Sequence, residues 1–327
     1  MNVTPTKEQI RGCLLGHAVG DALGVPVEFA GRDARDRDPV TGMRAYGTHH
    51  QPAGTWSDDH SLTLASAVAL TERGWDLHAM ADEFTGWLFR GKHLPRGSVF
   101  DVGGATREAI SKLDRGVKPE EAGGTRESSN GNGSLMRMAP AALFCAGDTP
   151  EGRRLRITNA SRLTHGHPRT LAVCALYAEI VATLVAGSDL PSSLDAARSR
   201  LAPVFYSRYA EEEPHLHKLM TADFATLPRS EISGSGYVVH TLEAALWCCL
   251  NFPDDYATPV LAAVNLGLDT DTTGAVTGSL AGLIHGETRL PAGSRGDAGI
   301  PEVWLAALTR REHLEEVCHG LAGAVSA

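Results

Sequence analysis

The stretch RGCLLGHAVGDALG, residues 11–24, has a glycine at every fourth position of a largely apolar run. A second stretch, GAVTGSLAGLIHG at residues 274–286, repeats this spacing. Each glycine inside a helix costs up to about 1 kcal/mol relative to alanine, so two such stripes need a compensating gain. Residues four apart share a helix face, and a face of small residues lets two backbones approach closely. The sequence therefore predicts two central, closely packed helices.

The rest of the chain has mostly the apolar period of helices, and alternation of Val, Ile and Thr over strand length is almost absent. We therefore predict an all-α fold. No repeat of roughly 20–50 residues and no long linker interrupts the pattern, which favours a single compact helical domain over residues 1–327. The helices are expected at 7–25, 61–73, 77–90, 104–114, 134–146, 151–162, 168–187, 192–201, 239–250, 256–266, 272–285 and 301–325.

The composition narrows the class of partner. The 327 residues are 43% apolar and 21% charged, with a formal net charge of -9. This acidic balance argues against nucleic acid or an anionic membrane as the main partner, because phosphate binding needs a basic surface. No apolar run approaches the roughly 20 residues that span a bilayer, and the first residues lack a signal-peptide layout. The six scattered cysteines are typical of buried apolar positions in a reducing compartment, so we expect a cytoplasmic protein.

Two acidic clusters each precede an apolar helical run. Ser57, Asp58 and Asp59 precede one, and the cluster from Asp269 to Thr272 precedes the second glycine stripe. Each cluster alone is equally typical of a helix N-cap. Together they offer hard oxygen ligands without cysteine or histidine, which favours Mg²⁺ or Mn²⁺ over zinc. Carboxylates held close repel one another unless cations neutralise them, so a binuclear metal site is the prediction.

A third segment, residues 130–140, is a glycine-rich turn leading into a helical pattern. Backbone N–H groups in such a turn can hold a phosphate, with Arg137 as a charge partner. The alternative is a tight turn beside a buried arginine. The segment lacks the G-K-[ST] of a nucleotide-binding P-loop and follows no strand, which argues against a nucleoside triphosphatase. A similar small-residue loop occupies residues 233–237.

Taken in order, these motifs resemble the ADP-ribosylglycohydrolase family. They are R-G-C-L-L-G-H-A-V-G-D-A-L-G-x-P-x-E-F, G-T-W-S-D-D, G-N-G-S-L-M-R-M-A-P, T-H-G-H-P-R-T, G-S-G-Y-V-V-H-T-L-E-A-A-L-W and N-L-G-L-D-T-D-T-T-G-A. The resemblance runs from about residue 8 to residue 322. It implies an orthogonal all-helical bundle, a pair of Mg²⁺ or Mn²⁺ ions, and hydrolysis of the bond between ADP-ribose and a modified side chain.

The resemblance also implies roles for individual residues. Glu28 and Asp101 resemble the family's catalytic carboxylates. The implied metal ligands are Ser57, Asp58, Asp59, Asp269, Asp271 and Thr272. The implied substrate-binding residues are Gly131, Asn132, Gly133 and Ser134 at the diphosphate, His165 in the cleft, and Gly234, Gly236 and Tyr237 on the adenosine side. His60 and Leu268 are bulkier than the residues the family usually has there, so we expect them to bear on acceptor specificity.

The expected activity is hydrolysis of arginine-linked ADP-ribose, with an ADP-ribosylated protein or peptide as substrate and ADP-ribose as product. Three alternatives stay open. The first is another linkage, such as serine O-linked ADP-ribose or a small ADP-ribosyl compound. The second is a catalytically silent relative that binds ADP-ribose, and the third is a binuclear-metal phosphohydrolase. Either Glu28 or Asp101 could carry the proton to the leaving group.

Overall fold

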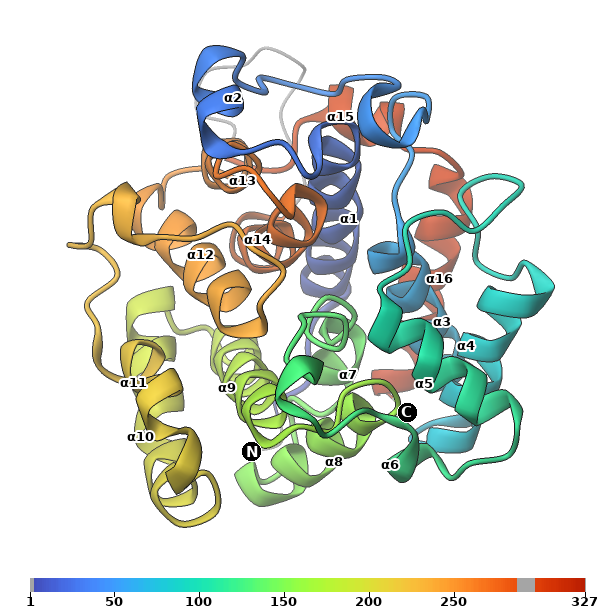
Figure 1. The fold of residues 1–327 in the computed structure, drawn as a ribbon, viewed down its shortest axis with the longest axis vertical. Helices are drawn as coiled ribbons and strands as arrows, with labels where there is room; N and C mark the ends of the chain where they lie inside the picture. Colours follow the sequence, from blue (N-terminus) through green and yellow to red (C-terminus); the bar gives the residue numbers. More distant parts are fainter. Residues whose placement is uncertain (1–2, 287–297, 327) are drawn as a thin grey trace.

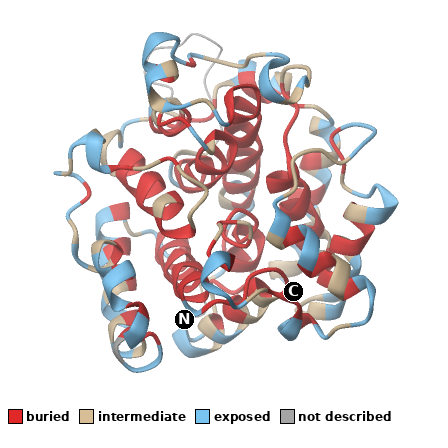
Figure 2. Cartoon of the chain, viewed as in Figure 1, coloured by how far each residue is buried: buried red, intermediate tan, exposed pale blue. Residues whose placement is uncertain are grey.

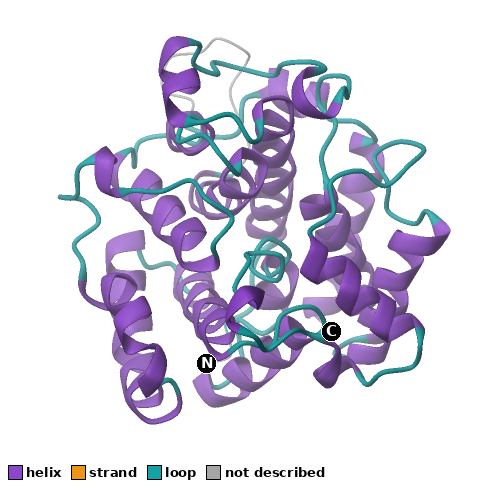
Figure 3. Ribbon diagram, in the orientation of Figure 1, coloured by secondary structure: helices purple, strands orange, loops and turns teal. Residues whose placement is uncertain are grey.

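The all-α prediction is confirmed by the computed structural model, which describes residues 3–286 and 298–326. These residues form sixteen α-helices, joined by loops and a few short 3-10 turns, and no β-strand (Figure 3). The helices are α1 Lys7–Gly24, α2 Arg32–Arg37, α3 Asp58–Arg73, α4 Leu77–Arg90, α5 Gly104–Asp114, α6 Pro119–Ala122, α7 Ala139–Phe144, α8 Pro150–Arg162, α9 Pro168–Val185, α10 Leu190–Arg208, α11 Glu213–Thr221, α12 Val238–Asn251, α13 Ala257–Val264, α14 Thr270–His285, α15 Glu302–Ala307 and α16 Arg311–Ser326.

The two glycine stripes face each other at the centre of the fold, as predicted. Helices α1 and α14 run antiparallel, because Gly12 meets Gly282, Gly16 meets Gly278 and Gly20 meets Gly274. A Cβ atom placed on Gly20 would lie 2.0 Å from the carbonyl oxygen of Gly274, far inside ordinary contact. Only glycine therefore permits this backbone separation. Both helices are buried almost throughout, as the red ribbons of Figure 2 show.

The other helices enclose this pair (Figure 1). Helices α12 and α13 pack on α14, while α16 and α3 pack beside α1, and α4 and α5 form the next layer beyond α3. Helix α9 joins α8, α10 and α12. It is the one described helix that is long and apolar enough to cross a membrane, with a mean hydropathy of 1.4, and 94% of that window is buried here. In this fold α9 is a core helix.

Several predicted boundaries were wrong. The helix expected at 134–146 is reduced to α7, because residues 131–137 form turns that bond to distant segments. The helix expected at 301–325 is split into α15 and α16 around Arg310, which has a φ of 56°. At this break Thr309 donates its N–H to the carbonyl of Gly54. Helices α2 and α11 lie in stretches where no helix was expected, and α10 continues through Pro203 to Arg208.

Candidate metal and substrate site

The two acidic clusters meet at the N-termini of α3 and α14. Asp58 and Asp59 are the first residues of α3, and Asp271 lies in the first turn of α14. The Thr272 hydroxyl donates to Asp59 Oδ2 across the two helices at 3.2 Å. Side-chain oxygens of Asp21, Asp59 and Asp271 lie within 4.8 Å of one another, and so do those of Glu28, Asp269 and Asp271. Two oxygen-rich groups therefore share Asp271.

Capping explains only part of this arrangement. Ser57 is the N-cap of α3, since its Oγ accepts the Asp59 N–H at 3.2 Å. The acidic side chains do not serve the same purpose. Asp59 Oδ1 and Asp271 Oδ2 are buried without a hydrogen-bond partner, a state that costs free energy unless a cation completes it. Buried, unpartnered carboxylate oxygens beside further carboxylates fit Mg²⁺ or Mn²⁺, which prefer hard oxygen donors.

The electrostatics of the acidic cluster also favour a bound cation. Burial, followed by the charge of neighbouring carboxylates, raises the pKa of Asp58, Asp59 and Asp271 well above the ordinary aspartate value. Burial also raises the pKa of Asp269. For a carboxylate, a raised pKa means that the negative form is disfavoured in these surroundings. Divalent cations would remove that penalty.

Asp21 is a site residue that the sequence analysis missed. It is fully buried on α1, and its carboxylate accepts the backbone N–H groups of Ser57 at 2.8 Å and His60 at 3.0 Å. Burial raises its pKa to about 7. These bonds fix the start of α3 against α1 and keep the Asp58–Asp59 segment facing α14. The available signal was an aspartate inside the first glycine stripe, where a core helix rarely carries a charge.

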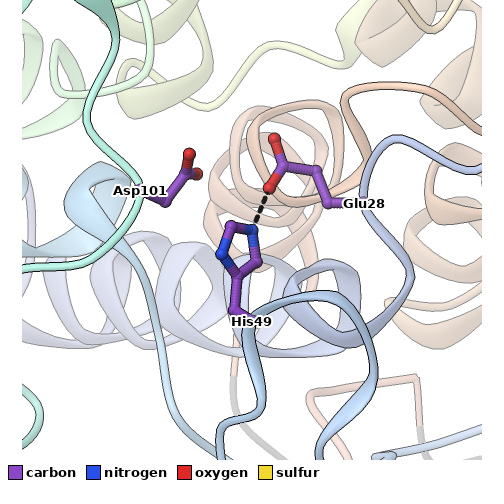
Figure 4. A group of neighbouring side chains, drawn as sticks. All are labelled: Glu28, His49 and Asp101. Atoms are coloured by element: carbon purple, nitrogen blue, oxygen red, sulfur yellow. Dashed lines mark hydrogen bonds and ion pairs between the residues drawn. The ribbon is translucent and has the colours of Figure 1, made fainter.

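Glu28 and Asp101 face each other beside the metal-ligand candidates (Figure 4). Glu28 follows a short 3-10 turn at the end of α1, and Asp101 lies before α5 with a φ of 45°. His49, from the loop between α2 and α3, hydrogen-bonds through Nε2 to Glu28 Oε2. Ligand atoms of these three residues lie within 4.8 Å of one another. Burial, and then the Asp101 charge, raises the pKa of Glu28 to about 10.

His49 is the second site residue that the sequence analysis missed. It lies in an irregular stretch with no motif around it, so local sequence carried no signal. Its loop docks on the end of α1, because Thr48 Oγ1 donates to the Glu28 carbonyl at 2.8 Å. A Cβ on Gly47 would overlap the Pro26 carbonyl oxygen, which lies 1.9 Å from that position. The loop is therefore held tightly to the residues that position Glu28.

A cleft of about 430 Å³ opens over these carboxylates. Asp58, Asp269 and Thr272 reach it, while Ser57, Asp59 and Asp271 are buried and do not line it. The predicted substrate residues that line the cleft are Gly131, Asn132, Gly133, His165 and Gly236. Tyr237 lines an adjoining, more open depression with Asn130 and Arg169.

Two predicted substrate residues are directed elsewhere. The Ser134 hydroxyl is buried and accepts a hydrogen bond from Ser161 Oγ at 2.9 Å. Gly234 packs against residue 267, where a Cβ would come 2.3 Å from the Gly267 carbonyl oxygen. Neither residue lines the cleft. Both shape the loops whose neighbours, Gly133 and Gly236, do.

The glycine-rich loop is tied to the acidic cluster. Asn132 donates through Nδ2 to Asp269 Oδ2 at 2.7 Å and through its backbone N–H to the Gly236 carbonyl at 3.0 Å. A Cβ on Gly133 would come 2.7 Å from the His165 ring, so a larger residue there would displace that ring. Burial lowers the pKa of His165 to about 3, which keeps it neutral. The loop and the histidine form one wall of the cleft.

The alternative interpretation of Arg137 is the correct one. Its guanidinium is buried, donates through Nη2 to Thr164 Oγ1 at 2.7 Å and stacks over the Phe84 ring at 4.7 Å. It therefore supports the turn from beneath and is not a phosphate partner. His60 is also turned inward, with its Nδ1 3.1 Å from His17 Nδ1. The ring is buried and does not line the cleft, so it would not contact an acceptor there directly.

Known proteins share the sequence and the fold of this chain. The profile of the ADP-ribosylglycohydrolase family matches residues 2–327. The chain is 31% identical over 316 residues to ADP-ribosylarginine hydrolase Tri1 of Pseudomonas putida (strain GB-1), covering 96% of this chain and 78% of that protein. It is 31% identical over 286 residues to ADP-ribosyl-[dinitrogen reductase] glycohydrolase of Rhodospirillum rubrum, covering 86% and 87%. A solved structure described as an ADP-ribosylglycohydrolase-related protein complex matches with a TM-score of 0.78 at 32% identity, over 98% of both chains.

Proposed function

The chain belongs to the ADP-ribosylglycohydrolase family, and from that premise we propose that it removes ADP-ribose from modified arginine side chains with the help of two divalent metal ions. The arginine linkage is supported by two relatives, 31% and 30% identical to this chain, that are named ADP-ribosylarginine hydrolases. The observation that carries the proposal is the convergence of two sets of three acidic residues. The two sets share Asp271 and lie beneath an open cleft. An ADP-ribosylated protein or peptide would be the substrate, and free ADP-ribose the product.

The metal ligands in this proposal are Ser57, Asp58, Asp59, Asp269, Asp271 and Thr272. When bound, Mg²⁺ or Mn²⁺ would supply positive charge near the ribose hydroxyls and lower the pKa of a nearby water. The protein holds these ligands on two helix N-termini that α1 and Asp21 bring together. The ligand geometry is thus built from rigid elements, as a catalytic site requires.

Hydrolysis breaks the bond between the ribose anomeric carbon and a guanidine nitrogen. The water contributes a hydroxyl group to that carbon and a hydrogen to the nitrogen, so atoms balance. Glu28 and Asp101 supply the proton transfer, because their carboxyl groups face each other beside the metal-ligand candidates. Charge at the anomeric centre develops in the transition state, where neighbouring carboxylates stabilise it.

The remaining cleft residues would bind the ADP-ribose portion. The Gly131–Gly133 loop presents backbone groups to the diphosphate, with neutral His165 against the adjacent ribose. Tyr237 and the depression around Arg169 would receive the adenosine. These contacts span both hollows, which share Gly131 and Gly236.

The test is to incubate the protein with arginine-, serine- and glutamate-linked ADP-ribosyl peptides, with Mn²⁺ or with EDTA, and to identify the products. The proposal predicts intact ADP-ribose from the arginine-linked peptide and none in EDTA. Release of AMP would indicate diphosphate cleavage and contradict it. Turnover of the serine-linked peptide alone would assign another linkage, and ADP-ribose binding without any turnover would indicate a silent relative.

A further inference from the structure

Three rings gather beside the two proposed proton-transfer residues, and one of them, Phe29, lines the cleft. Phe29 follows Glu28 in the chain and Phe100 precedes Asp101. The His49 ring contacts both phenylalanine rings. The His49 ring centroid is 5.8 Å from that of Phe29, edge to face, and 5.4 Å from that of Phe100. We call Phe29, His49 and Phe100 the aromatic lip. Each proposed catalytic carboxylate thus has an aromatic residue beside it in sequence.

Phe29 is held where a phenylalanine is not expected. It is 64% exposed and lines the cleft. Its φ is 65°, in the left-handed region that large side chains rarely adopt. The Phe29 N–H donates to the Leu268 carbonyl at 2.6 Å, and the Leu268 N–H donates to the Ala30 carbonyl at 2.7 Å. Leu268, itself at a φ of 67°, therefore fixes the strained backbone that presents the ring to solvent.

The chemistry of this region suits one kind of group. Aromatic faces attract planar cations, and the guanidinium of arginine both stacks on rings and pairs with carboxylates. Glu28 and Asp101 provide the carboxyl groups, and the lip provides the rings. A serine hydroxyl has no charge and no flat face, so it would gain little here. An acidic acceptor offers no cation for the rings to attract.

Resting on the proposed function above, we propose that the aromatic lip is the acceptor subsite and binds the guanidinium of the modified arginine, with Phe29 as its main contact. Leu268 then bears on acceptor specificity through the backbone of Phe29 and not through its own side chain. His49 is a positioning residue, because it touches both phenylalanines and holds the Glu28 carboxyl group. The lip thereby aligns the leaving group with the carboxyl that protonates it.

The test compares Phe29→Ala with Phe29→Tyr and with Phe89→Ala, using ADP-ribosylagmatine and an arginine-linked ADP-ribosyl peptide as substrates. Phe89 is a matched control, since it is a half-exposed phenylalanine on α4 that does not line the cleft. Alanine keeps the backbone strain at residue 29 unchanged, because it also carries a Cβ. We expect Phe29→Ala to raise KM about fivefold for both substrates, the upper size of a cation–ring contact at an exposed site. Phe29→Tyr should restore the wild-type KM.

Binding of free ADP-ribose gives the second readout. ADP-ribose lacks the guanidinium, so its Kd should stay within about twofold of wild type in Phe29→Ala. An unchanged KM, an equal loss of ADP-ribose affinity, or a loss with the peptide but not with ADP-ribosylagmatine would each overturn the lip as a guanidinium subsite. If wild-type protein turned over neither arginine-linked substrate, the proposed function itself would fail. The two failures are therefore distinguishable.

Discussion

Replacing Gly278 with alanine tests the central helix pair. A Cβ on Gly278 would lie 2.3 Å from the Gly16 carbonyl oxygen and 3.1 Å from the Tyr256 hydroxyl oxygen. Ordinary van der Waals contact begins near 3.4 Å, so α1 and α14 must separate locally by about 1 Å. The same shift strains the hydrogen bond that the Tyr256 hydroxyl donates to Gly16 at 2.6 Å.

The expected free-energy change follows from opposing effects. Alanine is the better helix former by up to about 1 kcal/mol. Overpacking of a tight core costs about 1–3 kcal/mol, and a weakened buried hydrogen bond costs about 1 kcal/mol more. The net expectation is a loss of about 1–3 kcal/mol in the free energy of unfolding. The sign is therefore opposite to the one that helix propensity alone predicts.

Gly323→Ala is the matched control. Gly323 lies inside α16 and is exposed, and a Cβ placed on it would meet no packing neighbour within 4 Å. The same substitution there should stabilise the protein by up to about 1 kcal/mol. Urea midpoints of both variants, with m-values to check that the unfolding transition is unchanged, make the comparison. A Gly278→Ala midpoint at or above that of wild type would refute the close packing of the two helices.

Three further predictions concern the acidic site. Asp271→Asn should abolish turnover while the far-UV circular dichroism spectrum stays that of wild type, because the residue joins both carboxylate groups; near-normal turnover at saturating Mn²⁺ would contradict its role. Asp21→Asn should destabilise the fold by about 1–3 kcal/mol, since an amide N–H₂ would face the backbone N–H groups of Ser57 and His60. The same substitution should weaken Mn²⁺ affinity. Wild-type affinity in a calorimetric titration would argue against Asp21 as a positioning residue. The folded-state pKa values of Asp21 and Glu28 are raised to about 7 and about 10, so their contribution to metal-free stability is full below pH 4 and is lost as pH rises through those values. The melting-temperature gain from Mn²⁺ over EDTA should therefore be larger at pH 8 than at pH 5.5, since the metal competes with these protons, and an equal gain at both would count against metal binding at the cluster.

The features predicted from sequence are those with a local physical cause. The glycine spacing identified which helices are central, because only glycine permits their backbone separation. The oxygen-rich clusters before two helical patterns marked the segments that converge at the site. The helical period of the apolar residues predicted the class of fold, because the apolar face of a helix is the face that is buried.

The features that sequence reasoning missed depend on contacts between distant residues. His49 reaches Glu28 because its loop packs against the end of α1. The residues between them contain no pattern that predicts this contact. Asp21 was visible as a charge in a glycine-rich helix, but its backbone partners at 57 and 60 appear only once α1 and α3 pack together. The segment at 134–137 has a helical pattern and yet forms turns, because Asn132 is bonded to Asp269 and Gly236.

The most direct test of the account is a count of the metal ions bound by the wild-type protein and by Asp271→Asn. Metal-free protein would be titrated calorimetrically with Mn²⁺, and anomalous diffraction from crystals grown with Mn²⁺ would locate the ions. We predict two ions per wild-type chain, between the groups that share Asp271, and loss of at least one ion in the variant. No ion at the cluster, or undiminished binding in Asp271→Asn, would contradict it.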